Sequence, residues 1–227
     1  MRVYRLFSVF ISLIGTVSAP LCAMDCDGDP RFNPASIIHV VTTPIRPRYF
    51  HNYSTAQIEQ MRHLKFHNRL LHNPGLTLAE HEFKMDYQVA GLEHPRRDGY
   101  CVWVDSVDVN FSYAQMDVYI SSDYPDGSCP YRVILNHENQ HVAIDERVLA
   151  KYRTLFEAVL RRNRTIPTRA HPLSVVSVKN GKSIIEERLN RIVHPILEAY
   201  KKEVIRENGK IDTPASYRRS QSLCNNW

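Results

Sequence analysis

Apolar and polar residues alternate through the first half of the chain and recur at helical spacing in the second half. From Leu76 to Ser122 the alternation has a period of two, which is typical of half-buried antiparallel strands. Its phase slips by one residue between Val104 and Val107, and this slip predicts a bulge or a break there. A separate apolar run at 37–41 predicts one further strand. The first half of the chain is therefore predicted to be rich in antiparallel strands.

Helical patterns lie on both sides of this segment. Ser54 and Gln57 have the spacing of a capping box, which predicts a helix that ends before residues 73–75. After a turn cluster at 123–129, apolar residues fall on one face of a long amphipathic helix, or of two helices joined by a bend. This stripe includes Ile134, Val148 and Tyr152.

A second helix is predicted from about Lys182 to Glu207, with a possible kink at Pro195 and an end at Asn208-Gly209. The polar tail beyond it is predicted to be irregular. Strands first and helices second indicate an α+β fold.

The N-terminus has the pattern of a cleavable signal peptide. Arg2 and Arg5 precede an apolar core at 6–17, and small residues follow it. Cleavage after Ala23 would leave residues 24–227 as a single exported domain, periplasmic or secreted. The mature chain has no apolar run of the length that a membrane span requires.

Composition narrows the possibilities further. The chain has 227 residues, of which 43% are hydrophobic and 23% charged, and this balance excludes wholesale disorder. The net charge of +5 is spread along the chain, so it does not indicate a nucleic-acid partner. Four cysteines remain after cleavage, and an even number in an exported chain predicts two disulfides. We expect Cys101 to pair with Cys129, and Cys26 with Cys224.

The segment His137-Glu138-Asn139-Gln140-His141 carries the chemistry, because it has the form H-E-x-x-H. Residues four apart share one face of a helix, so both imidazoles can bind one metal ion, for which zinc is the expected choice. Glu138 is offset from the histidines and can accept a proton from a metal-activated water. A single histidine on this apolar stripe would be typical of core packing, but two with this spacing favour a metal site. His81-Glu82 lacks the second histidine.

The sequence leaves the third metal ligand open. Asp145 is eight residues from His137, about 12 Å along a straight helix, so it is expected to be a hydrogen-bond partner rather than a ligand. Glu186, at the edge of the inward stripe of the second helix, is the first choice. The other candidates are His194, His171 and Asp212.

The motif, the strands before it and the helix after it resemble the zincin metallopeptidases. The resemblance implies a zincin-like α+β fold, with the motif on a helix beside a sheet. It also implies an edge strand that aligns extended peptide substrates, a part that Met116–Ser121 would play by position. Ile144 and Arg147 stand where metzincins have Gly and His, so the gluzincin type is nearer. More narrowly, residues 76–207 are loosely similar to the exported bacterial zincin-like proteins grouped as DUF922.

This resemblance implies an exported zinc metallopeptidase that hydrolyses peptides or proteins with Glu138 as the general base. Tyr200 and Tyr217 are conceivable donors to the developing oxyanion, although core packing and a solvated tail are their simpler roles. One alternative is a non-catalytic metal-binding envelope protein with a zincin fold. A second is a basic interaction module built on residues 161–164 and on Arg218-Arg219, whose lack of interleaved aromatic residues is typical of solvated surface.

Overall fold

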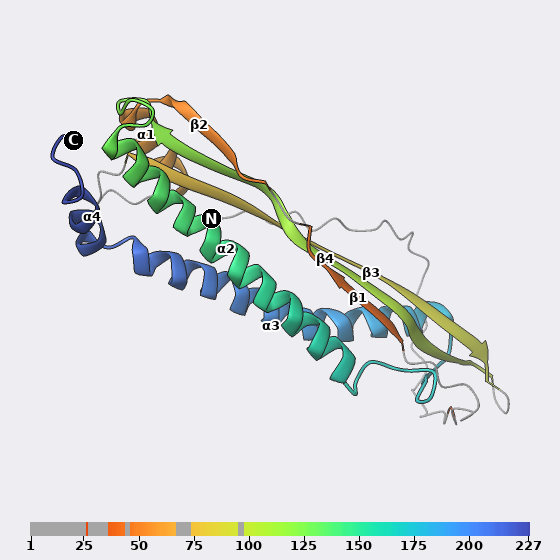
Figure 1. The fold of residues 1–227 in the computed structure, drawn as a ribbon. Helices are drawn as coiled ribbons and strands as arrows, with labels where there is room; N and C mark the ends of the chain where they lie inside the picture. Colours follow the sequence, from red (N-terminus) through yellow and green to blue (C-terminus); the bar gives the residue numbers. More distant parts are fainter. Residues whose placement is uncertain (1–25, 27–35, 44–45, 67–73, 95–97) are drawn as a thin grey trace.

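A computed structural model describes residue 26 and residues 36–43, 46–66, 74–94 and 98–227. The predicted signal peptide at 1–23 lies outside the described residues. The described chain is an α+β structure whose elements are, in order, β1 (Ile37–Val41), β2 (Arg48–Tyr53), α1 (Thr55–Phe66), β3 (Gly75–Glu93), β4 (Tyr100–Ser121), α2 (Cys129–Arg162), β5 (Leu173–Val175), α3 (Val178–Ile211) and α4 (Pro214–Gln221) (Figure 1).

The long strand β4 is the centre of a mixed sheet. Along one side it pairs antiparallel with β3, from Gly75 opposite Ile120 to Glu93 opposite Tyr100. Along its other side β5 pairs antiparallel, whereas β1 and β2 pair parallel. The expectation of antiparallel strands therefore holds for the β3–β4 hairpin. The strand predicted at 37–41 is β1, which pairs parallel, and β2, also parallel, was not predicted from the sequence. Parallel pairing depends on contacts between distant segments, which local alternation does not encode.

The predicted bulge is present in β4. Gln88 pairs with Ser106 and Val89 pairs with Val104, so Asp105 is the extra residue at the phase change. On either side of it Val104 and Val107 are both fully buried. The bulge therefore keeps the apolar side chains of β4 on the side that faces the core.

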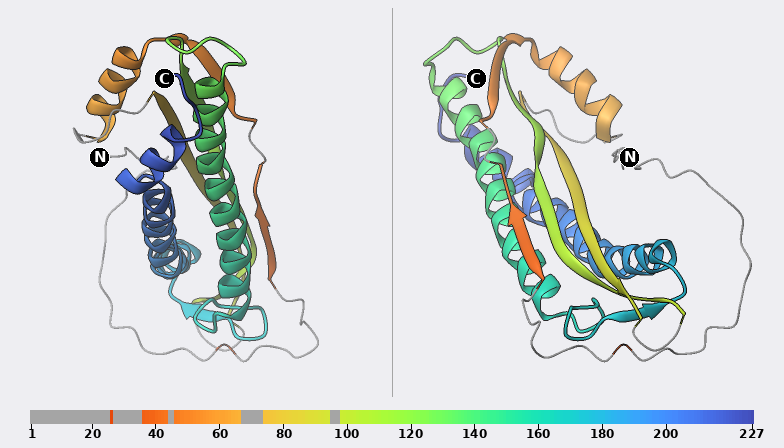
Figure 2. Two further views of the ribbon diagram at one scale, coloured as in Figure 1. Left: turned by 60° about the vertical axis from the view of Figure 1, so that its left-hand side comes forward. Right: turned by 90° about the vertical axis from the view of Figure 1, so that its right-hand side faces the viewer.

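Two long helices, α2 and α3, lie side by side along the sheet (Figures 1 and 2). Between the helices and the sheet, aromatic rings pack closely. The ring centroid of Phe111, in β4, lies 4.6 Å from that of Tyr200 and 5.4 Å from that of Phe156. Helix α2 is continuous, and Ser128 caps its N-terminus by accepting a hydrogen bond from the Tyr131 amide. Among the described residues, no helix combines the length and apolar character that crossing a membrane requires.

Helix α1 begins as the capping box predicted. Its capping residue, Ser54, receives the hydrogen bond from the Gln57 amide at 3.4 Å, and the Gln57 side chain accepts one from the Ser54 amide at 2.8 Å. Helix α1 lies at the end of the sheet where the C-terminus and the first turns of α2 also lie (Figure 1). This end of the molecule contains the candidate site.

The C-terminal region is more helical than the sequence indicates. Helix α3 continues through Asn208-Gly209 to Ile211, and Pro195 is accommodated inside it. The tail, predicted to be irregular, forms α4 between Thr213, which caps its N-terminus, and Gln221. Packing of α3 against α2 continues past the local stop signal, because tertiary contacts can outweigh the low helix propensity of glycine.

The expected disulfide pairing is wrong. The bonds join Cys26 to Cys101 and Cys129 to Cys224. Cys101 and Cys129 cannot pair with each other, because β4 runs extended between them for roughly 65 Å and a disulfide requires Cα atoms within about 7 Å. The two bonds therefore fasten opposite ends of β4. Two disulfides are compatible with an exported protein.

Candidate metal centre

His137 and His141 point to the same place. Both lie in α2 and are buried, with 6% and 8% of their surfaces exposed. Their Nε2 atoms are each 3.2 Å from a single carboxylate oxygen, Oδ1 of Asp212. The helix alone brings the two rings together, because four residues complete about one turn.

Asp212 comes from the far end of the chain. It is the residue directly after α3, and the antiparallel packing of α3 on α2 brings it opposite the histidines. Its side chain keeps 40% of its surface exposed. The group of two imidazoles and one carboxylate is therefore open to solvent on the Asp212 side.

These distances fit a metal site. Ligands at about 2.0–2.1 Å from a tetrahedral zinc ion lie about 3.3 Å from one another. The two nitrogen–oxygen distances of 3.2 Å are close to this value. The buried His137, Glu138 and His141 also have their ligand atoms within 4.8 Å of one another. This buried triad could hold a metal ion, and the Asp212 carboxylate lies directly against its two histidines.

Glu138 is almost fully buried, with 1% of its surface exposed. Its Oε2 accepts a hydrogen bond of 2.8 Å from the Thr77 hydroxyl of β3, while its Oε1 has no hydrogen-bond partner among the described residues. Burial raises the pKa of this carboxyl above its ordinary value, against the opposing effect of the two histidines. A buried carboxylate with one free oxygen and a raised pKa has the properties of a general base.

Gly75, the first residue of β3, makes room for Glu138. A Cβ atom at this position would collide with Oε1 of Glu138 and would lie 2.7 Å from Cγ2 of Ile134. The carbonyl oxygen of Gly75 accepts a hydrogen bond of 2.6 Å from Arg62 of α1. The lack of a side chain at Gly75 thus lets the edge of the sheet touch the site.

We expect Gly75→Ala to lower the free energy of unfolding by about 1–3 kcal/mol, because a methyl group would be forced into a filled space. The matched control is Gly209→Ala in α3, where an added Cβ meets nothing within 4 Å. This second variant should gain roughly 0.5–1 kcal/mol from reduced chain entropy. Urea denaturation of both variants measures the difference, and equal effects would contradict the close approach at Gly75.

Asn208 orients His141. Its side-chain amide donates to Oδ1 of Asp145 at 2.8 Å and to the Val204 carbonyl at 3.0 Å, so its oxygen is the acceptor for Nδ1 of His141 at 2.7 Å. Nδ1 therefore carries a proton, and Nε2 faces Asp212. As the helix geometry predicted, Asp145 is a buried hydrogen-bond partner outside the ligand group. Such support normally tunes metal affinity.

Asn208→Ala is expected to weaken zinc binding about 10- to 100-fold, because His141 loses the acceptor that fixes its ring. Competition against a chromophoric chelator provides the measurement. Lys202→Ala, at an exposed position of the same helix, is the control and should bind zinc as the unaltered protein does. Unchanged affinity in Asn208→Ala would remove this residue from the support of the site.

The charges around His141 favour its protonated form in the absence of metal. Burial favours the neutral ring, but the hydrogen bond to Asp212 and the negative charges of Glu138 and Asp212 outweigh it and raise the pKa of His141 to about 9. The same contacts hold the pKa of Asp212 well below its ordinary range, despite its partial burial. A proton thus bridges the space that a cation would occupy.

We expect zinc affinity to rise about tenfold per pH unit between roughly pH 6.5 and 9, because the metal must displace this proton. The direction follows from the raised pKa of His141. Below about pH 6.5, the ordinary pKa of this histidine in the unfolded chain, its ion pair with Asp212 stabilises the metal-free protein fully, and this stabilisation is lost as the pH rises past about 9. Zinc titration at several pH values measures the slope. A flat profile would contradict the ion pair.

Tyr217 borders the group from α4. Its hydroxyl donates to Oδ1 of Asp212 at 2.6 Å, and its ring lies 5.2 Å from that of His137. Burial and the negative charge of Asp212 raise the pKa of Tyr217, so it stays a proton donor. The alternative of a solvated tail is therefore wrong for this residue. Tyr200, by contrast, is buried in the core and donates to the Tyr113 hydroxyl.

The other ligand candidates lie elsewhere. Glu186, the first choice from the sequence, accepts a hydrogen bond of 3.1 Å from Tyr87, and it precedes Asp212 by about 39 Å along α3. His194 is exposed on the same helix, about 27 Å before Asp212. His171 is exposed in the loop between α2 and β5. Of the four candidates, only Asp212 meets the two histidines.

A second group, of Cys26, His94 and Cys101, also has ligand atoms within 4.8 Å of one another. Its two sulfur atoms are joined at 2.11 Å, so they form a disulfide and are not thiolate ligands. The predicted basic segment is partly engaged in the fold, because Arg161 pairs with Glu157 and donates to the Ile38 carbonyl. Neither feature is therefore a stronger candidate for a functional site than the group around His137.

Comparison with known proteins gives no assignment. No protein-family model, no curated protein and no solved structure matched the chain.

Proposed function

We propose that this protein is an exported zinc-dependent metallopeptidase with a zincin-like arrangement of helix and sheet. One observation carries the proposal: the Nε2 atoms of His137 and His141 converge at 3.2 Å on one oxygen of Asp212. Two imidazoles and one carboxylate, with a position left for water, are a ligand set of catalytic zinc sites. Structural zinc sites are usually closed by four protein ligands.

Each residue of the site has its own role in the proposed hydrolysis. Bound zinc would polarise the scissile carbonyl and make water more acidic. Glu138 takes the proton of the attacking water and passes it to the leaving amine, with Thr77 holding the carboxylate in place. Tyr217, whose hydroxyl donates to Asp212 in the metal-free protein, would turn that hydroxyl to donate a hydrogen bond to the oxyanion as it develops.

The edge of β3 is the better candidate for aligning a peptide substrate. The expectation for Met116–Ser121 is wrong, because this part of β4 lies between β2 and β3. By contrast, β3 pairs on one side with β4 and, among the described residues, with no strand on the other. Its segment Gly75–Ala79 passes Glu138, so a peptide added to this edge would lie beside the general base.

A non-catalytic metal-binding envelope protein is the second candidate. The near-complete burial of Glu138 favours it, since a water molecule must reach this carboxylate for hydrolysis. The exposure of 40% of the Asp212 side chain favours an accessible site instead. Both candidates predict bound zinc, and they differ in activity.

The test uses purified residues 24–227. Metal analysis should find one zinc per chain, and a quenched peptide library should be hydrolysed. A chelator should abolish hydrolysis, and added zinc should restore it. Zinc without hydrolysis would support the non-catalytic candidate, and absence of stoichiometric metal would overturn both.

A further inference from the structure

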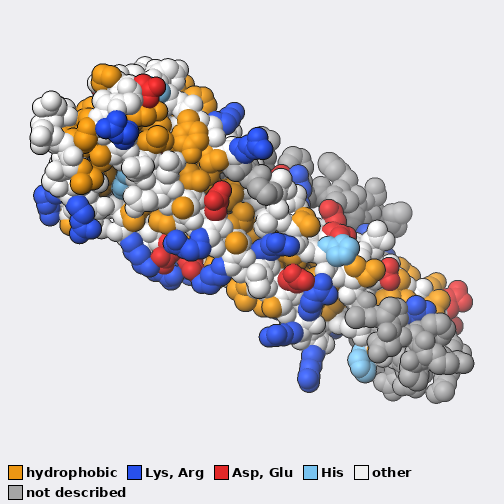
Figure 3. Space-filling view, viewed as in Figure 1, with side chains coloured by type: hydrophobic (Ala, Val, Ile, Leu, Met, Phe, Trp, Pro, Cys, Tyr) orange, Lys and Arg blue, Asp and Glu red, His pale blue; other side chains and the backbone are white. Residues whose placement is uncertain are grey.

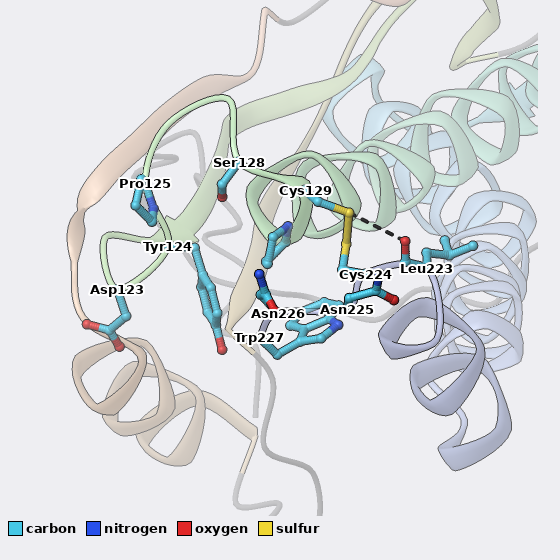
Figure 4. A pocket seen from close by; sticks show the side chains of 11 residues that line it. Asp123, Tyr124, Pro125, Ser128, Cys129, Leu223, Cys224, Asn225, Asn226 and Trp227 are labelled. Carbon is cyan, nitrogen blue, oxygen red and sulfur yellow. Dashed lines mark hydrogen bonds between the residues drawn. A yellow bond between two sulfur atoms is a disulfide. The ribbon is translucent and has the colours of Figure 1, made fainter.

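A cavity of about 580 Å³ opens at the same end of the molecule as the candidate metal centre. Its walls come from the β4–α2 loop, the first turn of α2 and the residues after α4 (Figure 4). Much of the lining is apolar or aromatic, and these residues are Tyr124, Pro125, Pro130, Leu223 and Trp227. Figure 3 shows hydrophobic side chains gathered on the surface at this end.

The Cys129–Cys224 disulfide fixes the shape of the cavity. It fastens the segment after α4 to the first turn of α2, and Cys129 Sγ also lies 3.4 Å from the Leu223 carbonyl (Figure 4). The Trp227 indole donates its N–H to the Gln221 carbonyl at 2.7 Å, and its ring centroid lies 5.8 Å from that of Tyr124. The polar atom of the indole is thus paired with the backbone, and the ring remains as apolar surface.

The cavity and the metal centre share their supporting elements. Cys129 at the cavity and His137 at the centre are eight residues apart in α2, about 12 Å along the helix axis. Likewise, Tyr217 and Trp227 belong to the same C-terminal segment. An extended peptide covers about 3.3 Å per residue, so three or four residues span the distance.

We propose that this cavity binds one large apolar side chain of a peptide substrate, three or four residues from the bond that is cleaved. The inference rests on the proposed peptidase function and adds a substrate preference to it. A volume of 580 Å³ is within the usual range for ligand sites, about 300–1,000 Å³, and the lining suits a Phe, Trp or Leu side chain. The lining contains no cationic residue, so an acidic side chain would find no positive charge to pair with.

Binding can be tested apart from hydrolysis. The chain contains two tryptophans, so Glu138→Gln combined with Trp103→Phe leaves Trp227 as the one indole reporter. Two blocked octapeptides of Gly and Ser, one with a single Phe and one with Asp in its place, are titrated in the presence of zinc. The Phe peptide should change Trp227 emission and bind at least about tenfold more tightly. Affinities within twofold of each other would overturn the proposal.

An exposed position provides the variant. Asn226 is exposed and its side chain lies beside Tyr124 and Trp227 (Figure 4), so Asn226→Asp adds a charge to the cavity wall with little risk to folding. It should weaken binding of the Phe peptide about tenfold or more. Asn190→Asp, at an exposed position of α3, is the matched control and should change nothing. If both variants weaken binding of the Phe peptide equally, or if neither weakens it, the assignment of the cavity is wrong.

Cleavage of the Phe peptide separates the two proposals. With the zinc-loaded protein of unaltered sequence, mass spectrometry should place the cut three or four residues from Phe. Cleavage at no fixed distance would overturn the subsite and leave the peptidase function intact. Selective binding of the Phe peptide without any cleavage would support the cavity as a binding site and count against the peptidase function.

Discussion

Glu138→Gln should lower kcat/KM for peptide hydrolysis by about 10²- to 10⁴-fold while one zinc per chain remains bound. Glutamine has the shape of glutamate and can still accept a hydrogen bond from Thr77, but it cannot take a proton from water. The metal should stay because the two histidines and Asp212 are unaltered. Metal analysis and peptide kinetics on the same preparation measure both quantities.

The control for this variant is Glu146→Gln, an exposed residue two turns further along α2. It should keep full activity and full zinc content. If Glu138→Gln hydrolyses peptides as fast as the unaltered protein, Glu138 is not the general base. If it instead loses the metal, Glu138 contributes to binding the ion, and the separation of roles proposed for the site is wrong.

Asp212→Ala should weaken zinc binding by more than about 100-fold. Residues that only support a ligand already contribute about 10- to 100-fold, and in the proposed site Asp212 is one of the ligands themselves. The change also removes the negative charge that draws both imidazoles together, with Nε2 distances of 3.2 Å. Chelator competition at a fixed pH gives the affinities, and hydrolysis should fall in parallel with zinc content.

Glu186→Ala is the matched control, because Glu186 is also a carboxylate of the α3 region and was the first choice from the sequence. Its hydrogen bond to Tyr87 lies far from the histidines, so this variant should bind zinc normally. A reversed result, with zinc lost in Glu186→Ala and kept in Asp212→Ala, would overturn the assignment of Asp212 as a ligand.

The helical part of the site was predictable because its spacing is local. His137, Glu138 and His141 lie within about one turn, and no other part of the chain is needed to bring them together. A similar local signal exists for Asn208 and Asp212, which are also four residues apart. It was obscured by Gly209, which predicts a helix end, although α3 continues to Ile211.

The sequence by itself determined the two histidines and the acid between them, the long alternating strands, and the bulge at Asp105, because each depends on a period within one element. The tertiary structure alone decided which ligand candidate meets the histidines, which cysteines pair, and where Tyr217 lies. His137 and Asp212 are 75 residues apart, and the disulfides span 75 and 95 residues. Contacts at such separations follow from the packing of α3 and α4 against α2 and the sheet.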